Sequence, residues 1–202
     1  MNSSLHSLNG AHLHSPTRPT QQQLVTGLAV GGGAGVLAAL LSFLGARAWY
    51  ASLIKPVWAL PIWALAPLQL LVCVLMGASL AHFWAARVPQ ARKRIVLRWF
   101  FAQIALGVLW ALCFFALHSA GLGYTVIMLW WCAVVALLWT GSRLSRTAFF
   151  LLLPLFSWVT FASSLNFAVL SFNVLRQTSA QMDADPNNSN SPANPPIIVK
   201  KK

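Results

Sequence analysis

The sequence from residue 49 to residue 63 reads Trp49-Tyr50-Ala51-Ser52-Leu53-Ile54-Lys55-Pro56-Val57-Trp58-Ala59-Leu60-Pro61-Ile62-Trp63, and it separates two long apolar runs. Tryptophan and tyrosine side chains gather where hydrocarbon meets water. Pro56 and Pro61 prevent the stretch from joining the helices on either side of it. The stretch therefore predicts a rigid aromatic loop at a membrane face, which is a suitable mouth for a flat, apolar ligand.

The composition indicates that lipid, not water, solvates most of this chain. Of its 202 residues, 58% are hydrophobic and only 8% are charged, whereas soluble domains carry about 25% charged residues. Five apolar runs, at 24–46, 63–86, 99–117, 122–142 and 147–175, are each about as long as the ~20 residues that cross a bilayer. Open sheets would leave backbone groups unsatisfied in lipid. We therefore expect an all-α integral membrane bundle of five transmembrane helices.

The domain organisation follows from the same runs. Residues 23–175 form the membrane domain, and the polar segments 1–22 and 176–202 are expected to be disordered tails. In the first run, Gly27, Gly31 and Gly35 recur every four residues on one helix face, a spacing that lets another helix approach closely.

The distribution of charge excludes several kinds of site. The only acidic residues are Asp183 and Asp185, so residues 1–182 contain no carboxylate side chain. Paired-carboxylate catalysis and Ser-His-Asp triads are therefore excluded from the membrane domain. Three cysteines without paired spacing read as core thiols. We expect no catalytic residue and no metal site.

The basic residues indicate topology. The net charge of +12 is carried in short segments between apolar runs, which suits topology signals and contacts with anionic lipid better than a nucleic-acid site. Eight basic residues fall on the side of the N-terminal segment, against three on the other side, namely Arg47, Lys55 and Arg176. This bias places the 49–63 loop on the face opposite the majority of the positive charge.

Several polar side chains inside the runs need partners. The indoles of Trp110 and Trp158 each require a hydrogen-bond acceptor when buried, and Gln103, Asn166 and Thr160 are the nearest candidates. Asn166 is either a tie between helices or a ligand contact, and the tie is favoured.

Other residues admit two interpretations. Gln69 and Gln103 could face each other or a ligand, and Lys55 could attract a ligand carboxylate or reach the headgroups. Three tryptophans of the fourth run, Trp130, Trp131 and Trp139, are expected in packing, dimer contact or a lipid belt rather than in a pocket.

A long ordered set of residues resembles a known family. It comprises Trp49-Tyr50, Leu53-x-Lys55-Pro56-x-Trp58-x-x-Pro61-x-Trp63-x-x-x-Pro67, Met76-Gly77, Gln103-x-x-Leu106-x-x-x-Trp110, Phe114-Phe115 and Pro154-x-x-x-Trp158-Val159-x-Phe161-Ala162-x-x-Leu165-Asn166-Phe167. From about residue 24 to 175 the chain resembles the TspO/MBR family, also called translocator proteins, tryptophan-rich sensory proteins or peripheral-type benzodiazepine receptors. The resemblance implies a five-helix bundle, usually a homodimer, that binds porphyrins, cholesterol and benzodiazepine-type drugs in a pocket under the first loop.

The resemblance also implies pocket roles for particular residues. It points to Trp110, Trp158 and Ala162 in the wall and to lid residues around the first loop. With the polar residues above, the predicted ligand-binding set is Trp49, Tyr50, Pro56, Trp58, Pro61, Gln69, Gln103, Trp110, Phe114, Trp158, Ala162 and Asn166. The chain departs from the usual pattern at Gln69, Cys73, Gly107 and Leu155, where the family usually carries Trp, Tyr, Asn and Tyr.

These features predict a membrane receptor or translocator for hydrophobic ligands, porphyrin, haem or a sterol, with no resident cofactor. The alternatives are a membrane enzyme that degrades porphyrin in light and a scaffold that oligomerises through small-residue faces such as Gly27, Gly31 and Gly35. The expected partners are membrane lipid, hydrophobic small molecules and a second copy of the chain, and not nucleic acid. The mitochondrial outer membrane, the endoplasmic reticulum and a bacterial cell envelope all remain open.

Overall fold

The computed structural model describes residues 18–46, 49–60 and 62–184. Its elements are α1 (Gln21–Ala46), α2 (Trp49–Ser52), α3 (Ile62–Ala85), α4 (Gln90–Ala111), the short π-helix η1 (Leu112–Ala116), α5 (Ala120–Ser142) and α6 (Arg146–Ala184). Five helices are long and apolar enough to cross a membrane, α4 and η1 counting together as one span. The prediction of an all-α, multi-pass integral membrane protein is confirmed.

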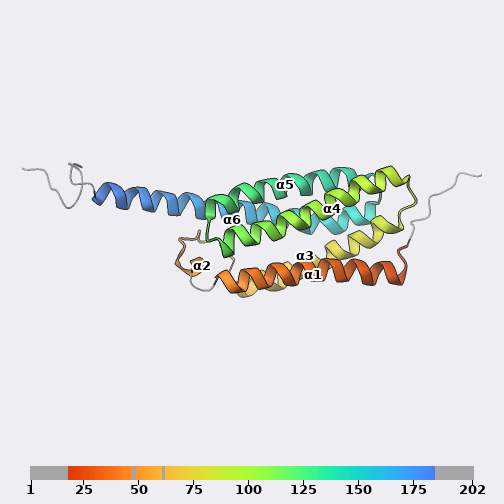
Figure 1. The fold of residues 1–202 in the computed structure, drawn as a ribbon, viewed down its shortest axis with the longest axis horizontal. Helices are drawn as coiled ribbons and strands as arrows, with labels where there is room; N and C mark the ends of the chain where they lie inside the picture. Colours follow the sequence, from red (N-terminus) through yellow and green to blue (C-terminus); the bar gives the residue numbers. More distant parts are fainter. Residues whose placement is uncertain (1–17, 47–48, 61, 185–202) are drawn as a thin grey trace, which may run out of the picture.

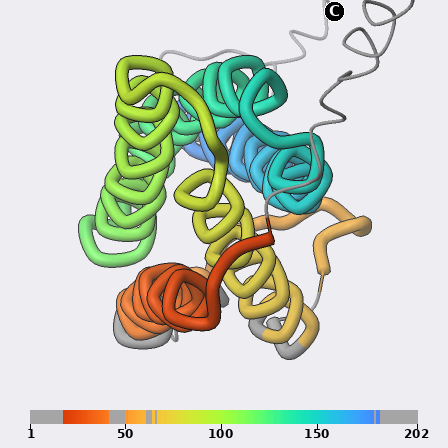
Figure 2. The backbone as a smooth tube through the Cα atoms, turned by 90° about the vertical axis from the view of Figure 1, so that its right-hand side faces the viewer, coloured from red at the N-terminus to blue at the C-terminus, as the bar shows by residue number. Residues whose placement is uncertain are grey.

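The five spans form a closed bundle. Around the ring, α1 packs on α3, α3 on α6, α6 on α5 and α5 on α4, and η1 brings the end of the α4 span back against α1 (Figures 1 and 2). Large apolar side chains fill the core between them, including the fully buried Phe83, Phe100, Ile127, Leu137 and Leu152. Because the ring is closed, any space left inside it is bounded by all five spans.

Two helices, α4 and α6, extend nine residues beyond one end of the expected runs. The α4 helix begins at Gln90, directly after Pro89, whereas the apolar run begins at 99. The α6 helix continues to Ala184, nine residues past the expected end at 175, and projects beyond the bundle (Figure 1). Hydropathy marks where the chain meets water, but polar and basic residues such as Gln, Arg and Lys are good helix formers and do not end a helix.

Backbone contact joins α1 to α3 along a line of glycines, which we call the glycine seam (Gly27, Gly31 and Gly35 on α1, Gly77 on α3). A Cβ atom added at Gly31 would lie 2.4 Å from the carbonyl oxygen of Cys73 and 2.8 Å from the Cα of Gly77. One added at Gly27 would lie 2.4 Å from the carbonyl oxygen of Gly77. The small-residue face of the first run is therefore occupied by another helix of the same chain.

The connection between η1 and α5 does not use the nearby glycines as turn residues. Gly121 and Gly123 lie inside α5, and the left-handed backbone conformation falls on His118, with φ of 52°. Ser119 caps α5, because its hydroxyl accepts a hydrogen bond from the backbone N–H of Leu122 at 3.3 Å. Gly123 instead makes room for the Phe114 ring, whose nearest atom would lie 2.8 Å from an added Cβ.

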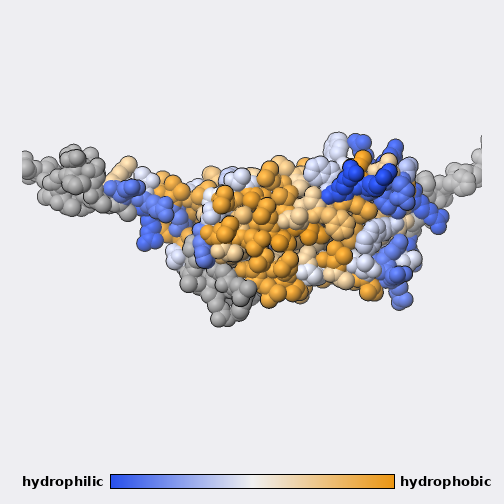
Figure 3. All heavy atoms as spheres, viewed as in Figure 1, coloured by the Kyte–Doolittle hydropathy of each residue, from blue (hydrophilic) through white to orange (hydrophobic). Residues whose placement is uncertain are grey.

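The surface shows how the bundle sits in a bilayer. On the face shown in Figure 3, apolar residues cover the middle of the molecule and hydrophilic residues gather toward its two ends. The end that carries the start of α1 also carries the α3–α4 and α5–α6 connections (Figure 1), where most of the described basic residues fall. One of them, Lys93, donates from Nζ to the carbonyl oxygen of Trp84 at 2.9 Å and so caps the end of α3.

Candidate functional site

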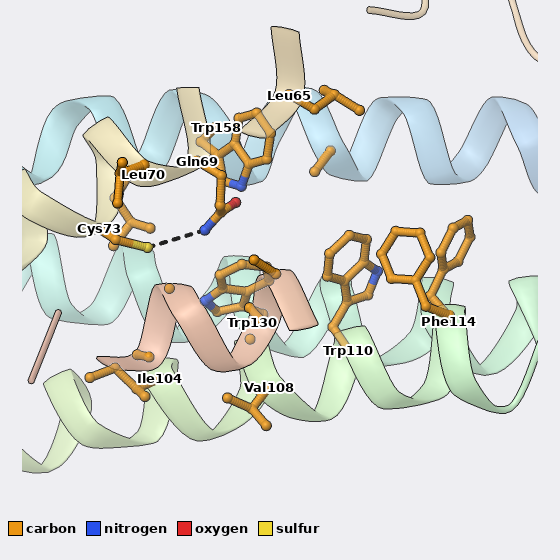
Figure 4. Close-up of a pocket in the computed structure, with 18 of the residues that line it drawn as sticks. Leu65, Gln69, Leu70, Cys73, Ile104, Val108, Trp110, Phe114, Trp130 and Trp158 are labelled. Atoms are coloured by element: carbon orange, nitrogen blue, oxygen red, sulfur yellow. Dashed lines mark hydrogen bonds between the residues drawn. The ribbon is translucent and has the colours of Figure 1, made fainter. Parts of the chain in front are cut away.

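A cavity of about 590 Å³ lies between the five spans, and α2 and η1 also contribute residues to its lining. Figure 4 shows tryptophan, phenylalanine and aliphatic side chains from several helices pointing into it. Its lining is Ala34, Gly35, Val36, Ala38, Ala39, Leu40, Tyr50, Leu65, Gln69, Leu70, Cys73, Met76, Gln103, Ile104, Gly107, Val108, Trp110, Phe114, Phe115, Trp130, Leu155, Trp158, Phe161, Ala162, Leu165 and Asn166. The volume is within the range of about 300–1,000 Å³ that holds drug-sized ligands.

One group of polar side chains in the wall is satisfied internally. Gln103, 1% exposed, accepts a hydrogen bond from Nε1 of Trp130 at 3.3 Å and donates from Nε2 to the sulfur of Met76 at 2.9 Å. The Trp130 ring lies directly against Gly107: a Cβ atom added at Gly107 would be 2.9 Å from the nearest atom of the indole. Gln103 is thus a tie between α3, α4 and α5.

Asn166 forms a second tie. When its amide is oriented to satisfy both ends, its oxygen accepts from Nε1 of Trp110 at 3.1 Å and its nitrogen donates to the carbonyl oxygen of Ala120 at 3.2 Å. Trp110 also stacks on Phe114, with ring centroids 5.7 Å apart and an interplanar angle of 17°. Asn166 therefore joins α4, α5 and α6, which agrees with the structural role favoured from the sequence.

Trp158 is the exception among the polar groups of the wall. Its indole Nε1 is buried and has no hydrogen-bond partner among the described residues. Thr160, one of the acceptors considered for it, instead accepts from Nε1 of Trp131 at 3.0 Å. A buried donor without an acceptor costs about 1–3 kcal/mol, and in Figure 4 this nitrogen points into the cavity.

Gln69 and Cys73 pair along α3. Nε2 of Gln69 donates to Sγ of Cys73 at 3.3 Å, drawn as the dashed line in Figure 4. Both are positions at which the chain departs from the usual family pattern, and the other two such positions, Gly107 and Leu155, also line the cavity. The departures therefore change the wall of the cavity itself.

The α2 helix contributes Tyr50 to the lining of the cavity, and the loop that follows α2 is held against it. Tyr50 contacts Phe114 and Phe115, with ring centroids 6.3 Å and 6.0 Å away. Burial raises the pKa of the Tyr50 phenol above its ordinary value. Nζ of Lys55 donates to the carbonyl oxygens of Tyr50 at 2.7 Å and Leu53 at 3.2 Å, and it lies 4.6 Å from the Tyr50 ring centroid. The ammonium is thus used to hold the loop together.

Asn173 of α6 fastens this loop to the bundle. Its Oδ1 accepts from the backbone N–H of Ile54 at 3.3 Å, and its Nδ2 donates to the carbonyl oxygen of Ile54 at 3.2 Å. The same nitrogen donates to the carbonyl oxygen of Val169 at 2.8 Å. We call this pair of contacts to Ile54 the Asn173 latch. The sequence reasoning missed it, because a polar residue at a span end carries no mark of its partner.

The structure brings most of the predicted site residues together. Eight of them line the cavity: Tyr50, Gln69, Gln103, Trp110, Phe114, Trp158, Ala162 and Asn166. Pro56 and Trp58 do not; Trp58 packs on Phe161 with ring centroids 5.9 Å apart and is 48% exposed. Pro61 and the side chain of Trp49 lie outside the described part of the chain.

Other lining residues were not predicted. Trp130 was expected in packing, a dimer contact or a lipid belt rather than in a pocket. It is 5% exposed and packs in the core, but it also lines the cavity, so its exclusion from the pocket is wrong. Trp139, by contrast, is 68% exposed on the outer face of α5. The α1 wall from Ala34 to Leu40 was also missed. Its small residues give no functional signal in the sequence.

Comparison with known proteins agrees with this architecture. Residues 25–171 match the model of the TspO/MBR family. The tryptophan-rich protein TspO of Chlorobaculum tepidum is 32% identical over 125 residues, covering 62% of this chain and 79% of that protein. The protein CrtK of Rhodobacter capsulatus is 35% identical over 129 residues, with 62% and 79% covered. The translocator protein of Bos taurus is 30% identical over 155 residues, with 73% and 92% covered. This chain, a five-span bundle around an aromatic cavity, belongs to the TspO/MBR family.

Proposed function

We propose that the chain is a receptor or translocator that binds a flat, largely apolar molecule, a tetrapyrrole or a sterol, in the cavity between its five spans. The observation that carries this proposal is the buried, unpartnered Nε1 of Trp158 on the wall of an apolar cavity of about 590 Å³. An apolar ligand with one hydrogen-bond acceptor would satisfy this donor. The name of the bovine relative, translocator protein, supports the same class of function.

Binding without turnover is favoured over catalysis. Residues 1–182 have no carboxylate, and Lys55 is engaged by backbone carbonyls. The described lining of the cavity therefore holds no carboxylate, histidine or lysine, the side chains that most often act as general acids and bases. The second candidate, light-dependent breakdown of porphyrin, rests on the three indoles of Trp110, Trp130 and Trp158 around one cavity.

The test is a titration of the full-length protein in lipid nanodiscs. Protoporphyrin and, separately, cholesterol are added while quenching of tryptophan fluorescence and porphyrin absorbance are followed in the dark and under light. Saturable binding with unchanged absorbance supports the proposal. Loss of absorbance that requires light and oxygen supports the enzyme, and the lack of saturable binding to either probe contradicts both.

A variant locates the site. Trp158→Phe keeps an aromatic ring, although a smaller one, and removes the N–H, so we expect binding to weaken about ten-fold, the effect of one hydrogen bond of about 1.4 kcal/mol. The matched control is Trp139→Phe on the exposed outer face of α5. Equal loss in both variants, or none in either, would remove Trp158 from the site.

We also propose, from the family resemblance, that the chain forms a homodimer. Exposed apolar side chains on α5, among them Leu129, Val135 and Trp139, offer a surface for it. The mass of the protein in nanodiscs, measured by light scattering, tests this proposal. A single copy at all protein concentrations would contradict it.

A further inference from the structure

Two arginines lie one turn apart on the outer side of α4. Val96, Phe100 and Gln103 define the buried face of this helix. At about 100° per residue, Arg94 and Arg98 fall on the opposite face, and both are exposed. Residues four apart on a helix have Cβ atoms about 5–6 Å from each other. The two guanidinium groups, which we call the arginine pair, can therefore reach one common point outside the bundle.

The charge of the arginine pair is not neutralised by the described part of the chain. Neither arginine has a hydrogen bond or an ion pair with another described residue, and residues 1–182 contain no carboxylate side chain. Lys93, by contrast, is held by the carbonyl oxygen of Trp84 at 2.9 Å. Like charges four residues apart destabilise a helix. The arginine pair thus favours an anion that comes from outside the protein.

The arginine pair also lies at the edge of the hydrocarbon region. The uncharged stretch of the chain begins at Trp99, directly after Arg98. One turn further along the same face, Phe101 is 47% exposed, and Ile95 and Trp99 beside the pair are exposed as well. In Figure 3 strongly hydrophilic residues over the start of α4, at the upper right, adjoin apolar residues. A ligand that fits both surfaces has an anionic head and a hydrocarbon tail.

A marker of the membrane interface lies at the same depth on α5. The contacts of Trp130 with Gln103 and Gly107 set the register between α4 and α5, which run in opposite directions. Trp139 is nine residues beyond Trp130, and nine residues back from the midpoint of Gln103 and Gly107 is position 96. Since both helices rise equally per residue, Trp139 is level with the arginine pair. Cζ of Arg143 lies 5.2 Å from the centroid of the Trp139 ring, and such aromatic residues collect at the headgroup level.

We propose that the arginine pair binds the phosphate group of an anionic phospholipid, whose acyl chains run along the apolar outer face of α4 over Phe101. Guanidinium groups suit phosphate because their N–H groups form charge-assisted, often bidentate hydrogen bonds with it. The lipid tail covers the apolar surface beside the pair, which a free phosphate ion would leave uncovered. The site lies on the outside of the bundle, so it does not depend on what the cavity binds.

The surroundings of the pair favour an anionic lipid over a zwitterionic one. A zwitterionic phospholipid offers the same phosphate but carries a cationic group close to it. Arg92 and Lys93 lie within the same turns of α4, and they repel that cationic group. Phosphatidylglycerol, whose head carries no positive charge, is therefore the probe, and phosphatidylcholine is its comparison.

The experiment uses the full-length protein in nanodiscs of phosphatidylcholine, with and without about one-fifth phosphatidylglycerol. Native mass spectrometry identifies the lipids that stay bound after release from the discs, and thermal melting measures the stabilisation that a bound lipid gives. We expect one phosphatidylglycerol to stay bound to each chain of the wild type. Its melting temperature should be about 2–6 °C higher in the mixed discs.

Two double variants separate the arginine pair from the overall charge. Arg94→Gln/Arg98→Gln should lower the affinity for phosphatidylglycerol about ten-fold or more and abolish the rise in melting temperature. The matched control, Arg87→Gln/Arg146→Gln, removes two exposed charges from the same end of the protein and should keep both effects. In phosphatidylcholine discs the first variant should melt no lower than the wild type, because the repulsion within the pair is gone.

The outcomes bear on separate parts of the inference. Equal loss of phosphatidylglycerol in the two double variants, or loss in neither, overturns the arginine pair as the site. An equal rise in melting temperature on adding inorganic phosphate to phosphatidylcholine discs overturns the assignment to a lipid. If the wild type retains phosphatidylcholine as firmly as phosphatidylglycerol, the selection of an anionic head is wrong, and this comparison needs no variant. Porphyrin and sterol titrations test the cavity, and their failure leaves the lipid site standing.

Discussion

The glycine seam makes a sharp prediction about stability. In Gly31→Ala the new Cβ would lie 2.4 Å from the carbonyl oxygen of Cys73 and 2.8 Å from the Cα of Gly77. Both are backbone atoms, which no change of rotamer can move aside. The added methyl is about 1 Å too close for van der Waals contact, so α1 and α3 have to separate along the seam.

The expected cost follows from this separation. Overpacking a well-packed contact costs about 1–3 kcal/mol, and each kcal/mol shifts the melting temperature of a protein of this size by about 2–4 °C. Gly31→Ala should therefore melt about 2–12 °C below the wild type. Gly32→Ala, its neighbour, is the matched control, because nothing lies within 4 Å of the added Cβ. Alanine favours the helix there by up to about 1 kcal/mol, so that variant should be unchanged or slightly more stable.

Thiol labelling offers a direct assay. Cys73 and Cys113 are buried and Cys132 is exposed, so in a Cys132→Ser background a thiol-reactive dye reports exposure of the interior as the protein is heated. The melting temperature of Gly35→Ala should lie between those of Gly31→Ala and Gly32→Ala, since its added Cβ meets only side-chain atoms of Cys73, at 2.8 Å and 3.0 Å. Equal melting temperatures for Gly31→Ala and Gly32→Ala would refute the close helix contact.

Three further outcomes are expected. Asn173→Ala removes both hydrogen bonds of the latch to Ile54. Because each bond contributes about 0.5–1.5 kcal/mol, bound porphyrin should dissociate about ten-fold faster. An unchanged dissociation rate in stopped-flow fluorescence would show that the loop is held by other contacts. Gln103→Leu leaves Nε1 of Trp130 without its acceptor and should lower the melting temperature by about 2–12 °C, whereas Gln177→Leu, which alters an exposed amide on the projecting part of α6, should leave it unchanged. Because burial raises the pKa of the Tyr50 phenol, this phenol loses its proton at a lower pH in the unfolded chain than in the folded one. The free energy of unfolding should therefore fall as the pH rises from about 9 to 11. The melting temperature of Tyr50→Phe should fall less over the same range.

Much of the fold was predictable because hydropathy and helix length act locally. Lipid leaves only helices for apolar runs of this length, so five runs gave five spans. The helix ends were less predictable. The start of α4 at Gln90 and the end of α6 at Ala184 fall in polar sequence, where hydropathy no longer reports whether the backbone remains helical.

The site was predictable to the extent that polar groups inside spans, such as an indole N–H or a side-chain amide, are costly unless they have a hydrogen-bond partner. That reasoning singled out Trp158 and Gln103. It could not tell which tryptophan of α5 faces inward, since Trp130 and Trp131 are adjacent in the sequence, and only the packing of Trp130 against Gly107 on α4 decides. Nor could it find the Asn173 latch, which joins residues 119 positions apart.

The glycine seam also determines where the cavity can open. At Gly27 and Gly31 the two helices touch through their backbones, so the face of α1 that meets α3 there has no side chain that could rotate out of the way. On α1 the lining of the cavity begins at Ala34 and at Gly35, the last glycine of the seam. We therefore expect any widening between α1 and α3 to be greatest at the opposite end of the two helices, beside α2, and a ligand to enter the cavity at that end.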